Sequence, residues 1–121
     1  MKIAFVSGNR ERLPDAVVPL GLLYIMSSVS EAHDKQLIDL CFADDPCQDL
    51  QKALQQFKPD VVALSMRNIQ NADYSGISDN IGYYESLLVA IRQVSAAPIC
   101  IGGAGFSTRP RELMGRLQPD Y

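Results

Sequence analysis

The sequence predicts a doubly wound α/β domain built on a parallel sheet. Four short apolar segments rich in β-forming residues alternate with four segments of helical periodicity, and this alternation is typical of helices that cross between parallel strands. Several of the apolar segments contain almost no polar residue, as expected for strands that helices cover on both faces. The 121 residues are enough for one packed core.

The first half of the chain supplies two strands and two helices. "KIAFVS" (2–7) and "KQLIDLCF" (35–42) are expected to be buried strands. Between them, "LGLLYIMSSVSEA" (20–32) is expected to be a helix, and "QDLQKALQQF" (48–57) follows as a second, amphipathic helix. The first helix is inferred from the helical spacing of Leu22, Leu23, Ile25, Met26 and Val29. In the second helix, Leu50, Leu54 and Phe57 are expected to face inward.

The second half repeats this alternation. "VVALS" (61–65) is expected to be a fully buried third strand, and "PICIG" (98–102) the fourth. A long polar stretch (66–80) and a helix near 81–95 separate them. "RPRELMGRL" (109–117) is expected to be the last helix, because its proline stands where a first helical turn tolerates one.

The connections predict the order of the strands. Right-handed crossovers lead to a flavodoxin-like, or Rossmann-like, sheet in which strand one is central and strands two and three lie beside it. In "QQFKPDVVALS", the end of a helix is followed by Pro-Asp and then by a strand. In "GRLQPDY", the end of a helix is also followed by Pro-Asp, but no strand segment comes after it. We therefore expect residues 1–121 to be a fragment that is truncated before a fifth strand.

Composition excludes several classes of partner. The net charge of −3 without a basic run makes nucleic acid and anionic membranes poor partners. No apolar segment approaches bilayer length, and the start does not have the pattern of a signal peptide. The cysteines, Cys41, Cys47 and Cys100, fit a reducing cytoplasm and lack the grouping of a zinc or iron–sulfur site. Cys41 and Cys100 are expected to be buried apolar thiols.

One edge of the sheet collects the unusual residues. Ligands of open parallel sheets bind at the carboxyl ends of the strands, and the loops 7–19, 42–47, 66–80 and 102–109 lie on that edge. The candidate binding residues are Ser7, Gly8, Asn9 and Arg10 after strand one, Ser65, Met66, Arg67 and Asn68 after strand three, and Gly102, Gly103, Ala104, Gly105 and Phe106 after strand four. Each cluster alone is a weak signal, since a glycine pair is often only a turn and neither a dinucleotide fingerprint nor a P-loop is present. Their convergence on one rim predicts a ligand site.

The titratable residues offer no acid–base pair. His33, the single histidine, lies in the turn before the second strand, at the opposite edge of the sheet. Asp44 and Asp45 follow the second strand, and acidic residues at such a position usually belong to a polar loop. Ser7 and Ser65 stand where a phosphoacceptor domain would need acids. No catalytic residue and no metal ligand is predicted for this chain.

Three stretches resemble a known family. "PLGLLYIMSSVSEAHDKQLIDL", "VVALSMRNIQNADY" and "PICIGGAGFSTRPRELM" resemble the N-terminal cobalamin (B12)-binding domain of B12-dependent radical S-adenosylmethionine (SAM) enzymes. The strongest part combines Ser-x-Arg-Asn after strand three with Gly-Gly-x-Gly-Phe-Ser after strand four. The resemblance covers nearly the whole chain and implies that residues 1–121 are a cobalamin-binding domain.

The resemblance also implies how the cofactor lies. The sheet would hold cobalamin across its C-terminal edge, with the dimethylbenzimidazole base of the nucleotide tail beside the central strands and the three clusters as its contacts. Gly102 and Gly103 would leave room for the flat base, and Ser65 would offer it a hydroxyl. Many B12 proteins ligate cobalt through the histidine of Asp-x-His-x-x-Gly, but the corresponding loop here reads "SGNRERLPD". Cobalamin is therefore expected base-off without a histidine ligand, with Arg67 under the corrin, where a guanidinium has no lone pair to offer.

The radical chemistry of such relatives needs a Cys-x-x-x-Cys-x-x-Cys motif, which the cysteines of this chain do not supply. The resemblance implies that a C-terminal radical SAM domain of the parent protein carries the 4Fe–4S cluster and binds SAM, and that this chain alone is not an enzyme. Methyl transfer is the commonest reaction among such relatives.

Three alternatives remain open. The chain could be a free-standing flavin- or nucleotide-binding α/β protein, in which case the purified protein would be yellow rather than red-orange. It could be a non-enzymatic corrinoid carrier or sensor module, against which the missing Asp-x-His-x-x-Gly argues. It could also be an α/β domain without a ligand.

Overall fold

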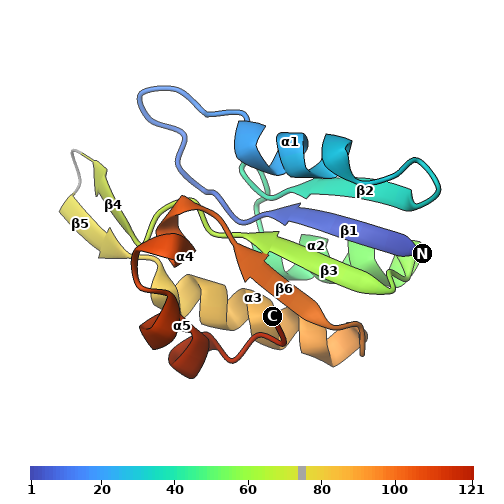
Figure 1. Ribbon diagram of the computed structural model, residues 1–121. Helices are drawn as coiled ribbons and strands as arrows, with labels where there is room; N and C mark the ends of the chain where they lie inside the picture. Colours follow the sequence, from blue (N-terminus) through green and yellow to red (C-terminus); the bar gives the residue numbers. More distant parts are fainter. Residues whose placement is uncertain (74–75) are drawn as a thin grey trace.

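Four strands of the computed structural model form a parallel sheet with the order β2-β1-β3-β6 (Figure 1). β1 (Lys2–Ser7) pairs with β2 (Asp34–Asp39) on one side and with β3 (Val61–Ser65) on the other. β6 (Ile99–Gly102) pairs with β3. The predicted parallel sheet with strand one in its centre is confirmed. The structure describes residues 1–73 and 76–121, with side chains described outside 71–79.

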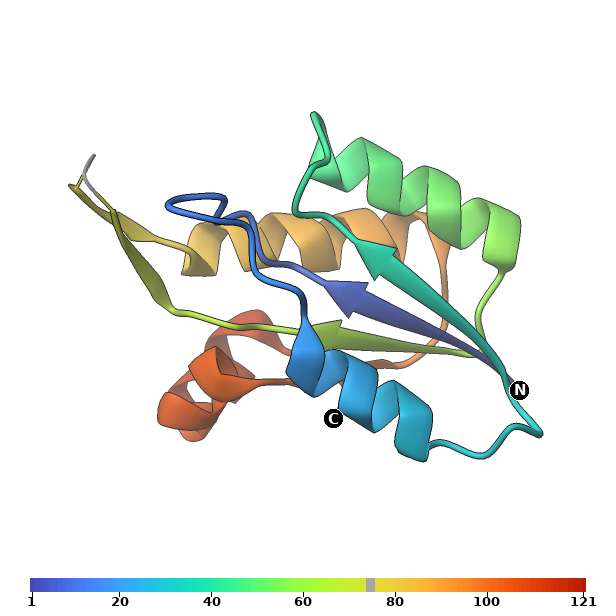
Figure 2. The same cartoon turned by 90° about the horizontal axis from the view of Figure 1, so that it is seen from above.

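Helices cover the two faces of the sheet unequally. Seen from above, α1 (Leu20–Ser28) lies on one side of the sheet, and α2 (Pro46–Phe57) and α3 (Ile81–Val94) lie on the other (Figure 2). The short helix α4 (Ala104–Thr108) follows β6 and leads into α5 (Pro110–Leu117), which packs against α3. The expected loop after strand four is therefore partly helical.

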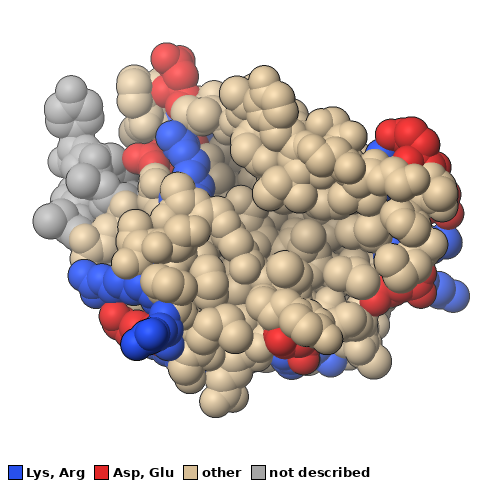
Figure 3. Space-filling model, in the orientation of Figure 1, with Lys and Arg blue, Asp and Glu red and all other residues tan. Residues whose placement is uncertain are grey.

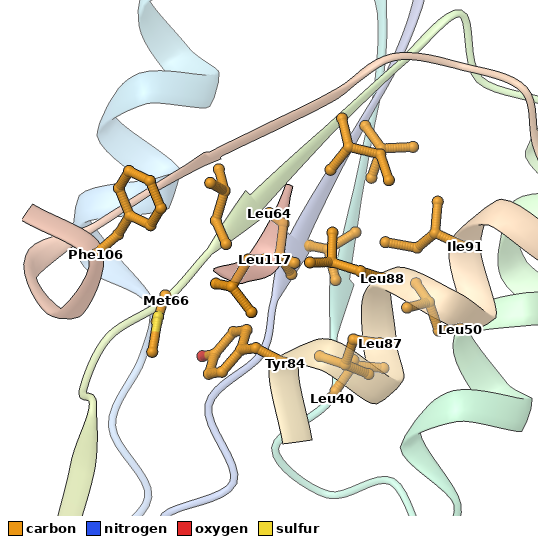
Figure 4. Close-up of a cluster of buried hydrophobic side chains, with 14 of the residues drawn as sticks. Leu40, Leu50, Leu64, Met66, Tyr84, Leu87, Leu88, Ile91, Phe106 and Leu117 are labelled. Atoms are coloured by element: carbon orange, nitrogen blue, oxygen red, sulfur yellow. The ribbon is translucent and has the colours of Figure 1, made fainter. Parts of the chain in front are cut away.

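The main core lies on the α2 and α3 face. Val6, Leu64 and Ile101 point to this side from three adjacent strands and are buried. Fully buried side chains of the two helices meet them, namely Leu50, Leu54, Leu87 and Ile91 (Figure 4). This face is closed, which leaves the opposite face for a ligand.

The α1 face has a smaller core made of Ile3, Phe5 and Leu22. Of the apolar residues in this part of the chain, Leu22 is buried and Met26 packs partly buried against the core, whereas Ile25 is 58% exposed. Apolar residues surround most of this helix, so their spacing cannot say which side faces the sheet. α1 also ends at Ser28 instead of residue 32, and the hydroxyls of Ser27 and Ser28 both donate to the Tyr24 carbonyl, an interaction that competes with helical hydrogen bonding.

Two elements have boundaries that differ from the predicted ones, and local hydrogen bonds explain both differences. α2 begins at Pro46, two residues earlier than predicted, because Asp45 caps it by accepting the Gln48 N–H at 3.0 Å. β2 ends at Asp39, three residues earlier than predicted, and the Asp39 carboxylate accepts the N–H of Cys41 at 3.2 Å, which turns the chain.

The polar stretch 66–80 contains regular structure that was not predicted. β4 (Gln70–Asp73) and β5 (Gly76–Asp79) form an antiparallel pair that projects beyond the parallel sheet (Figure 1). The strands read "QNAD" and "GISD", without the alternation of apolar and polar residues that predicts a strand. Residues 74 and 75 lie outside the described residues.

The outer edge of β6 is paired by residues 120 and 121. The Tyr121 N–H donates to the Ile99 carbonyl at 3.1 Å, and the Ile101 N–H donates to the Tyr121 carbonyl at 2.9 Å. This is the hydrogen-bond pattern of a parallel pair.

None of the helices among the described residues is long and apolar enough to span a bilayer.

Candidate functional site

The carboxyl ends of β1, β3 and β6 arrange mostly small residues in two rows on the α1 face. The outer row consists of the cross-strand partners Ser7, Ser65 and Gly102. The inner row, two residues back along each strand, consists of Phe5, Ala63 and Cys100. Since successive side chains of a strand point to opposite faces, both rows face α1 while the residues between them face the main core.

A cavity of about 440 Å³ lies over these rows. Its apolar wall comes from the loop before α1 and from α1 itself, through Val17, Val18, Leu20, Leu22 and Ile25. On this face of the molecule, the surface between α1 and β6 is hollowed and mostly uncharged, and most charged side chains lie toward the periphery (Figure 3). Arg67 is the one charged residue among those that line the cavity. A volume of this size and an apolar wall with a few polar groups are typical of small-molecule sites.

Seven of the thirteen predicted residues line this cavity. They are Ser7, Asn9, Ser65, Arg67, Gly102, Gly103 and Ala104, and they come from all three predicted clusters. The loops after strands one, three and four thus contribute residues to one cavity, and their role in binding stays a prediction.

The glycines after β6 have different reasons to lack a side chain. A Cβ on Gly102 would meet no atom within 4 Å, so this residue opens onto the cavity. Gly103 has φ +102°, and a Cβ there would lie 2.6 Å from the Met66 carbonyl oxygen. A Cβ on Gly105 would lie 2.9 Å from the backbone of Asn68. Close approach of two chain segments therefore explains Gly103 and Gly105, and only Gly102 leaves space for something outside the chain.

Two serine hydroxyls face the cavity without a partner. Ser7 is 2% exposed and Ser65 is half-buried, and neither hydroxyl makes a hydrogen bond with any described residue. Both hydroxyls border the cavity, and each can donate or accept a hydrogen bond there. The floor of the cavity therefore offers hydrogen bonds that the chain itself does not use.

The other six predicted residues have structural places among the described residues. Met66 and Phe106 belong to the main core. Asn68 donates to the Glu11 carboxylate at 3.2 Å. Gly8 and Arg10 contact a pair of tyrosines on α3, and Gly105 lies against the backbone of the segment after β3.

That tyrosine pair holds the ends of β1 and β3 together. A Cβ on Gly8 would lie 2.6 Å from the ring of Tyr84, whose hydroxyl donates to the Ser65 carbonyl at 3.2 Å. Burial raises the pKa of Tyr84 to about 12, so the hydroxyl remains a donor at neutral pH. The Arg10 guanidinium stacks 3.7 Å from the centre of the Tyr83 ring, and burial raises the pKa of Tyr83 as well. These contacts position the floor of the cavity from the opposite face.

Sequence reasoning missed the apolar wall and Cys100. The prediction that Cys100 is buried is wrong, because it is exposed and lines the cavity, whereas Cys41 is buried as predicted. β6 is covered by helices only on the side of Ile99 and Ile101, and a two-residue step from Gly102 would have placed Cys100 on the open side. The first helix is apolar on more than one face, and this pattern could have indicated that part of it forms an apolar wall.

The single histidine does not lie at this edge of the sheet. His33 lies at the opposite edge, as predicted, with Nδ1 3.4 Å from the Met1 amino group. Over the described part of the chain, no three His, Cys, Asp or Glu side chains lie close enough together to hold a metal ion.

Comparison with known protein families decides what kind of domain this is. The family model described as B12 binding domain matches residues 8–121. The chain belongs to the B12-binding domain family. The predicted family, its fold and cobalamin as its cofactor class are thereby confirmed.

Curated relatives of this B12-binding domain are methyltransferases. Over 122 aligned residues it is 29% identical to a tryptophan 2-C-methyltransferase of Streptomyces laurentii, covering 98% of this chain and 20% of that protein. Over 70 residues it is 40% identical to an uncharacterized methyltransferase of Pyrococcus horikoshii, covering 54% of this chain and 15% of that protein. The domain thus spans about a fifth or less of the length of these relatives.

Solved structures share its fold. The radical SAM methyltransferase TsrM of Kitasatospora setae, with cobalamin and a 4Fe–4S cluster bound, superimposes with a TM-score of 0.82 at 24% identity. The alignment covers 98% of this chain and 21% of TsrM. A second TsrM structure, with tryptophan and a SAM analogue bound, gives a TM-score of 0.77 at 23% identity over 98% of this chain and 22% of that one. At these identities the likeness establishes the fold.

Proposed function

We propose that this domain binds cobalamin with its nucleotide tail in the cavity above Ser7, Ser65 and Gly102, as the N-terminal module of a radical SAM methyltransferase. The observation that carries the proposal is the position of Gly102. It is the glycine of the Gly-Gly-x-Gly segment whose missing side chain opens onto the cavity, at the carboxyl end of a parallel strand where ligands of such sheets bind.

The size of the cavity supports the tail rather than the corrin as its occupant. About 440 Å³ accommodates a flat base with part of its nucleotide, whereas the corrin macrocycle with its side chains needs far more room. The corrin would lie outside, over the rim formed by Asn9, Arg67 and Ala104. The apolar wall of α1 would pack against the base.

We further propose that cobalamin is bound base-off and without a histidine ligand. The single histidine lies at the far edge of the sheet, beside the Met1 amino group. Arg67 stands at the rim of the cavity and is exposed, and its side chain forms no hydrogen bond or ion pair with the described residues. Its guanidinium is free to lie under the corrin and, lacking a lone pair, would leave cobalt without a protein ligand on that side.

A radical SAM domain of the same chain is the proposed partner, and the 4Fe–4S cluster and SAM are its proposed cofactors. The support is that the domain spans about a fifth of relatives that are methyltransferases. A cytoplasmic location fits the three free cysteines. The coding sequence that follows Tyr121 tests the partner, since an in-frame Cys-x-x-x-Cys-x-x-Cys motif supports it and a stop codon contradicts it.

Cobalamin binding is tested by two measurements on the purified domain. Hydroxocobalamin is added, the protein is desalted, and the absorbance spectrum is recorded; we expect retained cobalamin with the spectrum of a base-off form. In parallel, alkylation of Cys100 by iodoacetamide is followed by mass spectrometry with and without methylcobalamin in the dark. Because Cys100 lines the cavity, we expect the ligand to slow its alkylation.

Cys47 is the internal control for the alkylation. It is half-buried in a shallow depression between α2 and α3, on the other face of the sheet, so cobalamin should leave its rate unchanged. Protein that elutes colourless, or equal protection of both thiols, would overturn the proposal. Retention of a yellow flavin instead of cobalamin would favour a flavin-binding protein.

A further inference from the structure

The outer row of the cavity floor has a polar end and a bare end. Ser7, Ser65 and Gly102 are in register across three adjacent parallel strands. Neighbouring strands lie about 4.8 Å apart, so the backbone of Gly102 and that of Ser7 are about 10 Å apart. A flat group that rests on Gly102 and extends along this row passes Ser65 and reaches Ser7.

Ser7 differs from Ser65 in its burial. Ser65 is half-buried at the open part of the floor, whereas Ser7 is 2% exposed and its hydroxyl has no hydrogen-bond partner among the described residues. The Ser7 carbonyl is used, because it accepts the Leu40 N–H at 3.1 Å. The hydroxyl is therefore a deep polar group that lines the cavity and lacks a partner within the described chain.

We infer that Ser7 selects the lower base of the corrinoid, favouring a fused two-ring base with a nitrogen at its edge over a single-ring, phenol-type base. The inference rests on the proposed function. A fused base that lies over Gly102 and Ser65 with its nitrogen-bearing ring toward β1, and its sugar leaving past Asn9, would bring the free ring nitrogen within hydrogen-bond reach of the Ser7 hydroxyl. A single six-membered ring is shorter, carries no ring nitrogen, and leaves the hydroxyl without a partner.

The inner row limits how far the base can shift along the strands. Phe5 is buried behind Ser7 and packs in the small core with Leu22, so the base cannot slide deeper along β1. On β3 and β6, the inner row consists of the small residues Ala63 and Cys100. They leave space beneath the base and offer it no charged group. Ser7 is thus the hydroxyl at the enclosed end of the floor, and its loss should act on base choice rather than on corrin binding.

The experiment compares three corrinoids on the domain by equilibrium dialysis. They are cobalamin, a cobamide with a phenol-type base, and cobinamide, which has no base. For the natural sequence we expect cobalamin to bind about tenfold or more tightly than the phenol-type cobamide. In Ser7→Ala, loss of one neutral hydrogen bond should weaken cobalamin about three- to tenfold. The affinity for the phenol-type cobamide and for cobinamide should stay within a factor of two.

Ser86→Ala is the matched control, since Ser86 is exposed on α3 and its hydroxyl bonds only its own helix, at the Gly82 carbonyl. Thermal unfolding without ligand gives a second readout. Because the Ser7 hydroxyl has no partner in the chain, Ser7→Ala should melt at the same temperature or higher. Ser7→Cys keeps the side-chain volume and should weaken cobalamin as Ser7→Ala does.

The outcomes separate this inference from the proposed function. If cobalamin binds no more tightly than cobinamide in the natural sequence, the cavity does not hold the nucleotide tail and both ideas fail. If cobalamin binds more tightly than cobinamide, but Ser7→Ala leaves the ratio between cobalamin and the phenol-type cobamide unchanged, the tail site stands and Ser7 does not select the base. A lowered melting temperature of Ser7→Ala with an unchanged ratio would assign the hydroxyl a structural role.

Discussion

The carbonyl oxygen of Met66 lies 2.6 Å from the point where a Cβ atom on Gly103 would stand. The two segments are also bonded to each other, because the Met66 N–H donates to the Gly102 carbonyl at 2.7 Å and the Gly105 N–H donates to the Met66 carbonyl at 2.9 Å. Gly103 itself has φ +102° and ψ 170°, a region that residues with a side chain almost never occupy. The exits of β3 and β6 are thus joined by backbone alone.

Gly103→Ala should destabilise the fold without directly touching the ligand. The unfavourable backbone region costs about 1–3 kcal/mol, and the contact with Met66 adds to it. Urea denaturation followed by circular dichroism measures the loss. Gly115→Ala is the matched control, because a Cβ there meets nothing within 4 Å inside α5. It should stabilise the protein by about 0.5–1 kcal/mol. Equal effects of the two substitutions would contradict the role given to Gly103.

Gly102→Val should leave the fold intact and block the cavity. Valine suits a strand, and a Cβ at this position meets no atom within 4 Å. The added side chain would occupy the place of the base, and overpacking of about 1–3 kcal/mol corresponds to a loss of cobalamin affinity of about fivefold to about 150-fold. Equilibrium dialysis and a melting curve check both parts. A folded Gly102→Val protein that binds cobalamin as tightly as the natural sequence would place the base elsewhere.

Arg67→Ala should change the cobalt spectrum more than the affinity. The side chain lies at the rim and makes no hydrogen bond or ion pair with the described residues, so the cavity below it should persist. Removing the guanidinium alters what lies under the corrin, and water gains access to cobalt there. The absorbance spectrum of bound cobalamin reports this. Arg111→Ala, an exposed arginine of α5, is the control and should leave the spectrum as it was. An unchanged spectrum in Arg67→Ala would exclude the proposed position of Arg67.

The stability of the β6 edge should depend on pH through Asp120. Its carboxylate accepts the Ile99 N–H at 2.8 Å and pairs with Arg92 at 3.3 Å, and these contacts lower its pKa. Because the folded pKa lies below the value of an unfolded Asp, about 3.9, the stabilisation is fully present above that value. It is lost as the pH falls through the lowered folded pKa.

Asp120→Asn should therefore melt at a lower temperature than the natural sequence at pH 7, and the gap should shrink as the pH is lowered below about 4. Scanning calorimetry between pH 7 and pH 3 measures it. Asp44→Asn serves as the control, since Asp44 is exposed and has no hydrogen bond or ion pair within the described residues. A gap that stays constant with pH would mean that the Asp120 carboxylate does not stabilise the fold in its ionised form.

The sequence alone determined the parallel sheet, its strand order and the edge where the site lies. "KIAFVS" and "VVALS" are apolar on both faces, which requires helices on both sides, and right-handed crossovers then leave one order of strands. The carboxyl ends of parallel strands lie at one edge, so Ser7, Ser65 and Gly102 had to come together. These features follow from local patterns and from chirality, and both can be read along the chain.

Only the tertiary structure decided which residues face the cavity. The side of α1 that packs on the sheet depends on what the neighbouring strands leave uncovered, and Ile25 and Cys100 consequently line the cavity. The hairpin of β4 and β5 depends on the pairing of two polar segments that no periodicity marks. Gly102 and Gly103 are the same residue type side by side, yet one opens onto the cavity and the other lies against Met66. The sequence does not show which atoms lie opposite the missing side chain of a glycine. The fold decides this, because it brings those atoms together.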